Sequence, residues 1–246
     1  MLMKSIFLAD AHLKYPTDEN YRRLNSFLQN LPEDVDNLFI LGDFFDFWFG
    51  YREVVFSVYV PILATLEALV QRGIKLYFIE GNHEISLGPF FRTHLHVHSN
   101  PSELSVYLSG QHLYLAHGDL LDDSQQWYRQ WAGFIKSPFI CRLISLIPPD
   151  FTYKIAQWLS KISRNQSQNA SHIPEKLTNK LADIFRAGHD VAIIAHYHHP
   201  AQNQVVLNDQ KYPVYHLGDW ITDYSYLVLE DGNFQLKKAT AQLPTS

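Results

Sequence analysis

The chain has 246 residues, of which 46% are hydrophobic and 18% charged, with 11 Gly and 12 Pro. These proportions exclude a disordered, collagen-like or coiled-coil chain, and the single cysteine, Cys141, excludes an internal disulfide framework. Because binding to phosphate backbones needs a basic stripe, the formal net charge of −5 argues against a nucleic-acid partner.

Short apolar runs alternate with amphipathic helical patterns along the chain, which is typical of an α/β fold. The predicted strands are the apolar runs 6–9, 38–41, 76–79, 113–116, 191–195 and 214–217. Helices are predicted where apolar residues recur at helical spacing, in the segments 21–31, 62–70 and 177–185. We expect a single domain over residues 1–246.

The sequence offers no membrane-spanning or targeting pattern. The apolar stretch before Asp10 has at most five residues, which is too short for the core of a signal sequence. No apolar run approaches the ~18 residues that a spanning helix needs. We therefore expect the chain to be cytoplasmic.

The region 124–171 departs from the α/β pattern. It has no strand-like run, and its helical patterns are interrupted at Pro138 and at Pro148-Pro149. In its second half, Ile155 and Trp158 share one helical face, and Arg164 lies largely on another. We expect a helical cap inserted into the α/β scaffold, although an ordinary pair of core-facing helices would give the same pattern.

Polar side chains follow five of the predicted strands, at the edge where α/β sheets bind their ligands. Carboxylates and neutral imidazoles are ligands of divalent transition metals. The candidate ligands are Asp10, His12, Asp43, Asn82, His117, His196 and His198. This set is too large for one ion, but with one bridging carboxylate it fits two ions roughly 3.5–4 Å apart, an arrangement used for phosphoryl displacement.

The motifs Asp-X-His, Gly-Asp-X-X-Asp, Gly-Asn-His-Glu, His-Gly-Asp and a late His-X-His, between Asp10 and His198, resemble those of the calcineurin-like metallophosphoesterases. The resemblance implies a four-layer α/β sandwich with a dinuclear metal site, often containing Mn²⁺. One metal would be held by Asp10, His12, Asp43 and His198. The other would be held by Asp43, Asn82, His117 and His196, with Asp43 bridging the two.

The same resemblance assigns roles to residues beside the metals. It implies that water activated by the metals is the nucleophile and that His83 is the general acid beside the leaving group, a role that suits a histidine pKa. Asp46 would orient the metal ligands without binding a metal itself. A solvated turn residue is the alternative interpretation of Asp46.

A narrower resemblance concerns the substrate. Asp122-Asp123 and Tyr128 after His117-Gly-Asp, the helical insertion, and Tyr215-His-Leu-Gly-Asp-Trp220 resemble the branch of the family that acts on UDP-2,3-diacylglucosamine in lipid A biosynthesis. That branch is peripheral on the cytoplasmic face of the inner membrane and forms 2,3-diacylglucosamine 1-phosphate and UMP. Its cap holds the acyl chains. The resemblance implies substrate contacts from Asn82, Tyr128, Arg164, Ser167 and His196.

Three positions depart from that branch. This chain has Gly81-Asn82-His83-Glu84 where the branch commonly has Gly-Asn-Arg-Asp, and Asp46 where it usually carries Glu.

Two other functions compete with glycolipid hydrolysis. A cytosolic nucleotide or cyclic-nucleotide phosphodiesterase on the same scaffold would need a polar cap, whereas this insertion is rich in Trp, Phe and Ile. A non-catalytic interaction module should lack ligands or the catalytic histidine, and here all are present. We therefore favour hydrolysis of a UDP-linked acylated glucosamine by two divalent metals.

Overall fold

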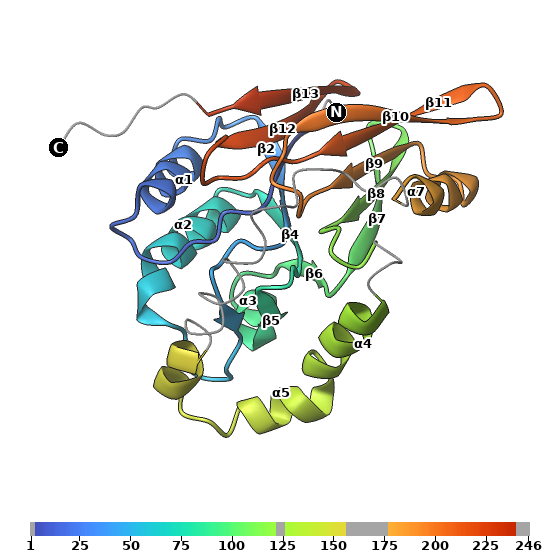
Figure 1. The fold of residues 1–246 in the computed structure, drawn as a ribbon. Coiled ribbons are helices and arrows are strands. Elements are labelled where there is room, and N and C mark those ends of the chain that lie inside the picture. The colour runs from blue at the N-terminus through green and yellow to red at the C-terminus, as the bar shows by residue number, and fades with distance from the viewer. Residues whose placement is uncertain (1–2, 122–125, 156–176, 240–246) are drawn as a thin grey trace.

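The computed structural model describes residues 3–121, 126–155 and 177–239. Within them, two large β-sheets face each other and helices cover both outer surfaces, which gives four layers (Figure 1). The expected α/β sandwich is therefore confirmed. Every strand and helix predicted from the sequence is present within these residues.

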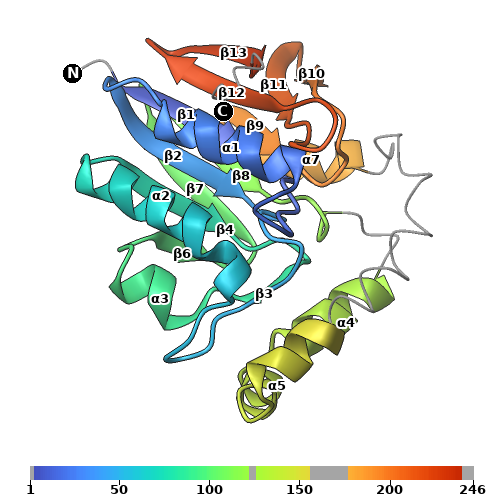
Figure 2. The same ribbon diagram turned by 90° about the vertical axis from the view of Figure 1, so that its left-hand side faces the viewer.

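The first sheet has six strands in the order β13-β12-β1-β2-β4-β6. Strands β1, β2, β4 and β6 are parallel to one another, and β12 and β13 complete one side as antiparallel strands. Its strands are β1 (Lys4–Leu8), β2 (Val35–Leu41), β4 (Lys75–Ile79), β6 (His98–Asn100), β12 (Ser225–Glu230) and β13 (Asn233–Lys238). Its outer face carries α1 (Glu19–Gln29), α2 (Val60–Gln71) and α3 (Gly88–Thr93), as Figure 2 shows.

The second sheet has five strands in the order β10-β11-β9-β8-β7, with β8, β9 and β11 parallel. Its strands are β7 (Glu103–Leu108), β8 (Gln111–Ala116), β9 (Val191–Ile194), β10 (Ala201–Leu207) and β11 (Gln210–His216). Helix α7 (Leu177–Arg186) covers its outer face. Strands β3 (Trp48–Phe49) and β5 (Glu84–Ser86) form a small parallel pair, and a 3₁₀ turn, η1 (Ser57–Tyr59), precedes α2.

The central strands are apolar on both faces because each sheet is covered on both sides. Between the sheets, Phe7 of β1 stacks on Phe39 of β2 at 4.6 Å between ring centroids, next to buried Leu115 and Ile193. A second cluster lies under α1 and α2, and a third lies under α7. These packed layers fix the positions of the strand ends.

The described part of the insertion consists of helices that lie below the sandwich (Figure 2). They are α4 (Gln126–Ile135), α5 (Pro138–Ile144) and a helical segment that begins at 149. Ser137 caps α5 by accepting a hydrogen bond from Ile140 N, and Pro138 occupies the first turn. The remainder of the predicted cap, 156–171, including Trp158, lies outside the described residues.

The insertion helices expose an unusual number of large apolar side chains. We call this set the apolar cap face: Trp127, Trp131, Phe134, Phe139, Leu143, Leu146, Ile147, Phe151 and Ile155. These side chains do not pack into the core of the described residues, so this part of the insertion is not simply a core-facing helix pair.

Two side chains, Lys136 and Tyr51, tie the insertion to the sandwich through polar contacts. The Lys136 ammonium donates a hydrogen bond to the carbonyl of Gly81 at 2.7 Å and lies 3.7 Å from the Glu80 carboxylate. The Tyr51 hydroxyl hydrogen-bonds to the carbonyl of Ile147 at 3.1 Å and also contacts Thr152. Among the described helices, none has the length and hydropathy needed to cross a membrane.

Candidate metal centre

The ends of β1, β2 and β4 from one sheet and of β8 and β9 from the other meet at one edge of the sandwich. Backbone hydrogen bonds join the loops there: His12 N donates to Asp43 O at 2.9 Å, and Asp10 N to Gly42 O at 3.1 Å. The two sheets are joined by His196 N, which donates to Asp10 Oδ2 at 2.9 Å. The predicted ligands therefore converge although they span most of the chain.

Many of these residues adopt left-handed backbone conformations, which are uncommon for residues other than glycine. Their φ angles lie between 44° and 72° at Asp10, His12, Asp43, His196 and His198. Such a conformation persists only where the surrounding structure over-determines it, and it is concentrated at functional sites. Here it turns the side chains out of the strand ends towards a common point.

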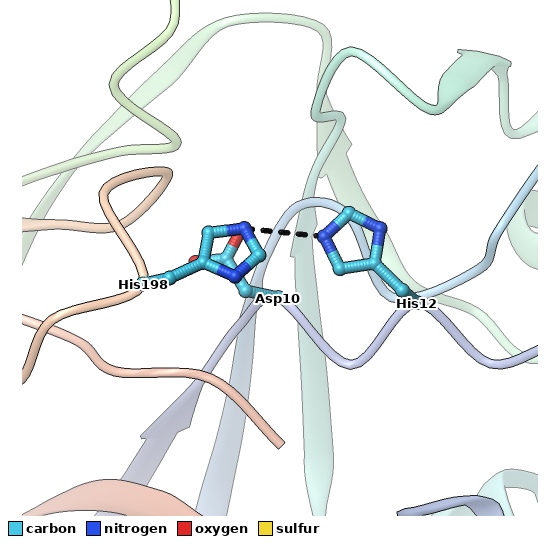
Figure 3. Close-up of side chains that lie close together, drawn as sticks. All are labelled: Asp10, His12 and His198. Carbon is cyan, nitrogen blue, oxygen red and sulfur yellow. Dashed lines mark hydrogen bonds and ion pairs between the residues drawn. The ribbon is translucent and has the colours of Figure 1, made fainter. Parts of the chain in front are cut away.

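Asp10, His12 and His198 form the first cluster of possible metal ligands (Figure 3). The two imidazole Nε2 atoms lie 3.3 Å apart, and His198 Nε2 lies 3.6 Å from Asp10 Oδ1. Asp10 Oδ1 is buried and has no hydrogen-bond partner among the described residues. A buried carboxylate oxygen without a donor, facing two imidazole nitrogens, is an arrangement that a divalent cation satisfies.

Asp43, His117 and His196 form the second cluster, with Asn82 beside them. His117 Nε2 lies 3.5 Å from Asp43 Oδ2 and 3.3 Å from Asn82 Oδ1. The other ring nitrogen of His117 lies 2.8 Å from the carbonyl of Leu41, which directs Nε2 into the centre. Asp43 Oδ2 also lies 3.7 Å from His12 Nε2, so this oxygen faces both clusters, as a bridging ligand must.

Burial and mutual charge shift the pKa values in both directions. Burial raises the pKa of Asp10 to about 6 and lowers that of His196 to about 4. Burial also holds the pKa of His12 well below its usual value. Burial opposes ionisation of both Asp43 and His117, yet their mutual attraction keeps the pKa of Asp43 low and raises that of His117 to about 10. Burial thus keeps His12 and His196 neutral, the form in which an imidazole binds a cation, whereas His117 has to lose a proton to do so.

His83 lies beside both clusters, and with His12 and Asp43 it forms a third group of possible metal ligands. Its Nδ1 is 2.6 Å from the carbonyl oxygen of Asp46, and its Nε2 is 3.9 Å from Asp43 Oδ2. Burial lowers the pKa of His83, but Asp43 and the Asp46 carbonyl outweigh that effect, so the net shift is upward. Asp46 is only 3% exposed, so its interpretation as a solvated turn residue is wrong. Its contact with His83 runs through the main-chain carbonyl.

Glu84 is part of the centre, although no role was predicted for this residue beyond its place in the Gly-Asn-His-Glu motif. It is fully buried, and its carboxylate accepts hydrogen bonds from the backbone N–H groups of Asp43 and Gly81, both at 2.9 Å, and of Phe45 at 3.1 Å. Burial raises the pKa of Glu84 to about 7. Glu84 thus joins the loop after β2 to the loop after β4.

Two glycines allow these loops to approach each other. A Cβ atom on Gly81 would lie 2.3 Å from Asp43 Oδ1, and one on Gly42 would lie 2.7 Å from His117 Nδ1. Gly42 also has a φ of +85°, where a side chain is strained. Any larger residue at either position would displace a candidate ligand.

The predicted substrate contacts are only partly described. Asn82 and His196 lie in the centre. Tyr128 lies within α4, the first helix of the insertion. Arg164 and Ser167 lie outside the described residues.

Comparison with known proteins agrees with this geometry. The sequence profile of the calcineurin-like phosphoesterases matches residues 3–200, so the chain belongs to that family. It is a metal-dependent phosphoesterase, because it belongs to this family, its candidate metal ligands converge in one centre and its curated relatives are hydrolases.

The curated relatives are similar over nearly their whole length. The UDP-2,3-diacylglucosamine hydrolase of Pectobacterium carotovorum is 31% identical over 95% of this chain and 98% of its own. The enzyme of the same name from Yersinia pseudotuberculosis is 30% identical over the same shares. That from Vibrio cholerae is 28% identical over 92% of this chain and 94% of its own.

Proposed function

We propose that this phosphoesterase hydrolyses the diphosphate of UDP-2,3-diacylglucosamine to 2,3-diacylglucosamine 1-phosphate and UMP. The observation that carries the proposal is the apolar cap face, which follows the His117 loop and is tied to the Gly81 loop through Lys136. An enzyme for a small polar nucleotide has no use for such a surface. The names of the curated relatives support the same substrate.

In this proposal the centre holds two divalent cations, with Mn²⁺ the metal we expect. Asp10, His12 and His198 would hold one and Asn82, His117 and His196 the other, with Asp43, whose Oδ2 faces both clusters, shared between them. When bound, the cations lower the pKa of the attacking water and neutralise the charge that develops on the phosphoryl oxygens. Glu84 and the two glycines keep the ligand loops in register.

His83 supplies the proton in this mechanism. The Asp46 carbonyl accepts the Nδ1 proton of His83 and so fixes the ring, which leaves Nε2 directed towards the centre. In the charged imidazolium form, Nε2 carries a second proton and donates it to the oxygen that leaves with the glycolipid phosphate. The water oxygen bonds to the phosphorus of the UMP moiety as the P–O bond to that oxygen breaks, and the proton that the water loses passes to solvent.

The apolar cap face receives the acyl chains in this proposal. Each CH₂ group removed from water contributes ~0.8 kcal/mol, so even part of two acyl chains provides a large binding energy. Cationic residues lie along the same helices, with Arg142 in the last turn of α5 and Lys154 near the end of the described segment. We propose that they meet anionic headgroups on the cytoplasmic face of the inner membrane, to which the enzyme binds peripherally.

Removal of apolar area from α4 tests the substrate assignment. We would replace Trp131 and Phe134, which are 55% and 58% exposed and lie three residues apart, by serine together. The value of kcat/KM for UDP-2,3-diacylglucosamine should fall by about tenfold or more, because remote binding contributes only to substrates that possess the remote group. Hydrolysis of bis(p-nitrophenyl) phosphate should be unchanged.

The matched control is Tyr107→Ser, which removes an aromatic side chain that is 75% exposed on β7. This variant should hydrolyse both substrates at the wild-type rate. An equal loss on both substrates in the double variant would assign these side chains to folding. If the wild-type enzyme does not cleave the glycolipid at all, the proposed substrate is wrong, and only the assignment as a phosphoesterase stands.

A further inference from the structure

The segment that follows β11 reaches back to the first cluster of metal ligands. Leu217 N donates to Ile194 O at 2.8 Å, next to the end of β9, and Trp220 N donates to Asp10 O at 3.1 Å. Between these two anchors lies Asp219, which is 4% exposed. The segment therefore touches both chain regions that supply the first cluster.

The two oxygens of the Asp219 carboxylate have different partners. Oδ1 accepts hydrogen bonds from the backbone N–H groups of Ile221, Thr222 and Asp223 at 3.1, 2.7 and 3.0 Å. Oδ2 lies 3.4 Å from Nδ1 of His198, and the Thr222 hydroxyl contacts both oxygens, Oδ1 at 3.0 Å and Oδ2 at 3.1 Å. The turn thus fixes the carboxylate through Oδ1 and presents Oδ2 to the imidazole.

A partner at Nδ1 decides which nitrogen of a histidine is free to bind a metal. When Nδ1–H points to an acceptor, Nε2 carries the lone pair. His198 Nε2 then faces Asp10 Oδ1 and His12 Nε2. For the buried His117 ring the acceptor is the Leu41 carbonyl, whereas the His198 side chain is 38% exposed. The Asp219 carboxylate therefore restrains the His198 ring, whose Nδ1 would otherwise be hydrated.

We propose that Asp219 is a positioning residue that holds His198 with Nε2 towards Asp10 and so sets the affinity of the first metal position. The proposal rests on the ligand assignment given above and is independent of the substrate. Asp219 touches neither substrate nor the reacting atoms. Its effect is exerted through His198.

The test is calorimetric titration of Mn²⁺ into the metal-free protein and its Asp219→Asn variant. Asparagine keeps an oxygen for the three backbone N–H groups, but it replaces the negative oxygen beside His198 by an amide. We expect the affinity of one metal position to fall about 10–100-fold, the usual cost of losing such a partner. Asp223→Asn is the matched control, since Asp223 lies in the same turn and pairs with Lys238 instead of His198.

A double-mutant cycle separates positioning from loop capping. In a His198→Ala background, Asp219→Asn should lower the metal affinity by less than about twofold, because the ring through which it acts is gone. If Asp219→Asn lowered the metal affinity as much in the His198→Ala background as in the wild-type protein, the proposal would be wrong. Unchanged metal affinity in Asp219→Asn, with a lower melting temperature of the metal-free protein, would reduce Asp219 to a loop cap.

The tautomer of His198 provides a measurement that needs no variant. In the wild-type protein loaded with diamagnetic Zn²⁺, nitrogen NMR should show the proton of His198 on Nδ1. A proton on Nε2 would refute the proposal even if the variants failed to fold. The readouts are metal affinity and tautomer, so failure of the substrate assignment would leave them unaffected.

Discussion

The metal centre and the insertion helices are built in opposite ways. The centre's side chains are buried or half-buried except for Asn82, and several are fixed by more than one contact, as at His117 and Asp43. The insertion exposes its apolar side chains and is tied to the sandwich through Lys136 and Tyr51, with Cys141, Ile144 and Tyr153 packed partly against the core.

This difference matches two demands on the enzyme. Stabilising a transition state requires groups that are already in place before the reaction, because any reorganisation raises the barrier. Binding a flexible acyl chain requires apolar area but little geometric precision. We therefore expect changes at the centre to affect every substrate, and changes at the insertion to affect only substrates with a lipid.

The largest effect is expected from Asp43→Ala, which removes the carboxylate shared by both clusters. Hydrolysis of every substrate should fall by more than about 10³-fold, beyond the loss of a single transition-state donor. The content of bound divalent metal, measured by elemental analysis, should fall as well. Asp183→Ala, on the surface of α7, is the control. A variant with full metal content and full activity would contradict the bridging role of Asp43.

A smaller and substrate-dependent effect is expected from His83→Ala. A general acid matters most when the leaving group is poor, so the loss on a phosphodiester with a basic alkoxide leaving group should be on the order of 10²–10⁴-fold. The loss on a nitrophenyl ester should be smaller, because nitrophenolate leaves without a proton. Comparison of kcat on the two substrates checks this. Equal losses would point to a role in positioning the phosphate.

The smallest effect is expected from Lys136→Met, which removes the hydrogen bond between the insertion and the Gly81 carbonyl. We expect kcat/KM for the glycolipid to fall about two- to tenfold, the worth of one partly buried hydrogen bond. Bis(p-nitrophenyl) phosphate should be hydrolysed at the wild-type rate. Lys136→Arg should recover part of the loss, because the guanidinium also donates. An equal loss in the hydrolysis of bis(p-nitrophenyl) phosphate would mean that Lys136 acts on the metal centre and not on binding of the lipid.

Much of the centre was predictable from the sequence, because its ligands follow immediately after continuous apolar runs. A run such as 191–195 can only be a strand buried on both faces, and its end fixes where His196 and His198 emerge. The antiparallel strands β7, β10, β12 and β13 were not predicted. Strand β7, for example, alternates exposed and half-buried residues along the edge of its sheet and has no apolar run.

The sequence by itself determined the scaffold, the candidate ligands and the family, because each depends on residues that are close together along the chain. Only the tertiary structure decided the roles of Glu84 and Asp219, whose partners Asp43 and His198 lie 41 and 21 residues away. It also decided that the Asp46 carbonyl accepts a hydrogen bond from His83, and that the side chains of the apolar cap face are exposed. A buried carboxylate and a solvated one look alike in a sequence, because burial is set by what packs against the residue.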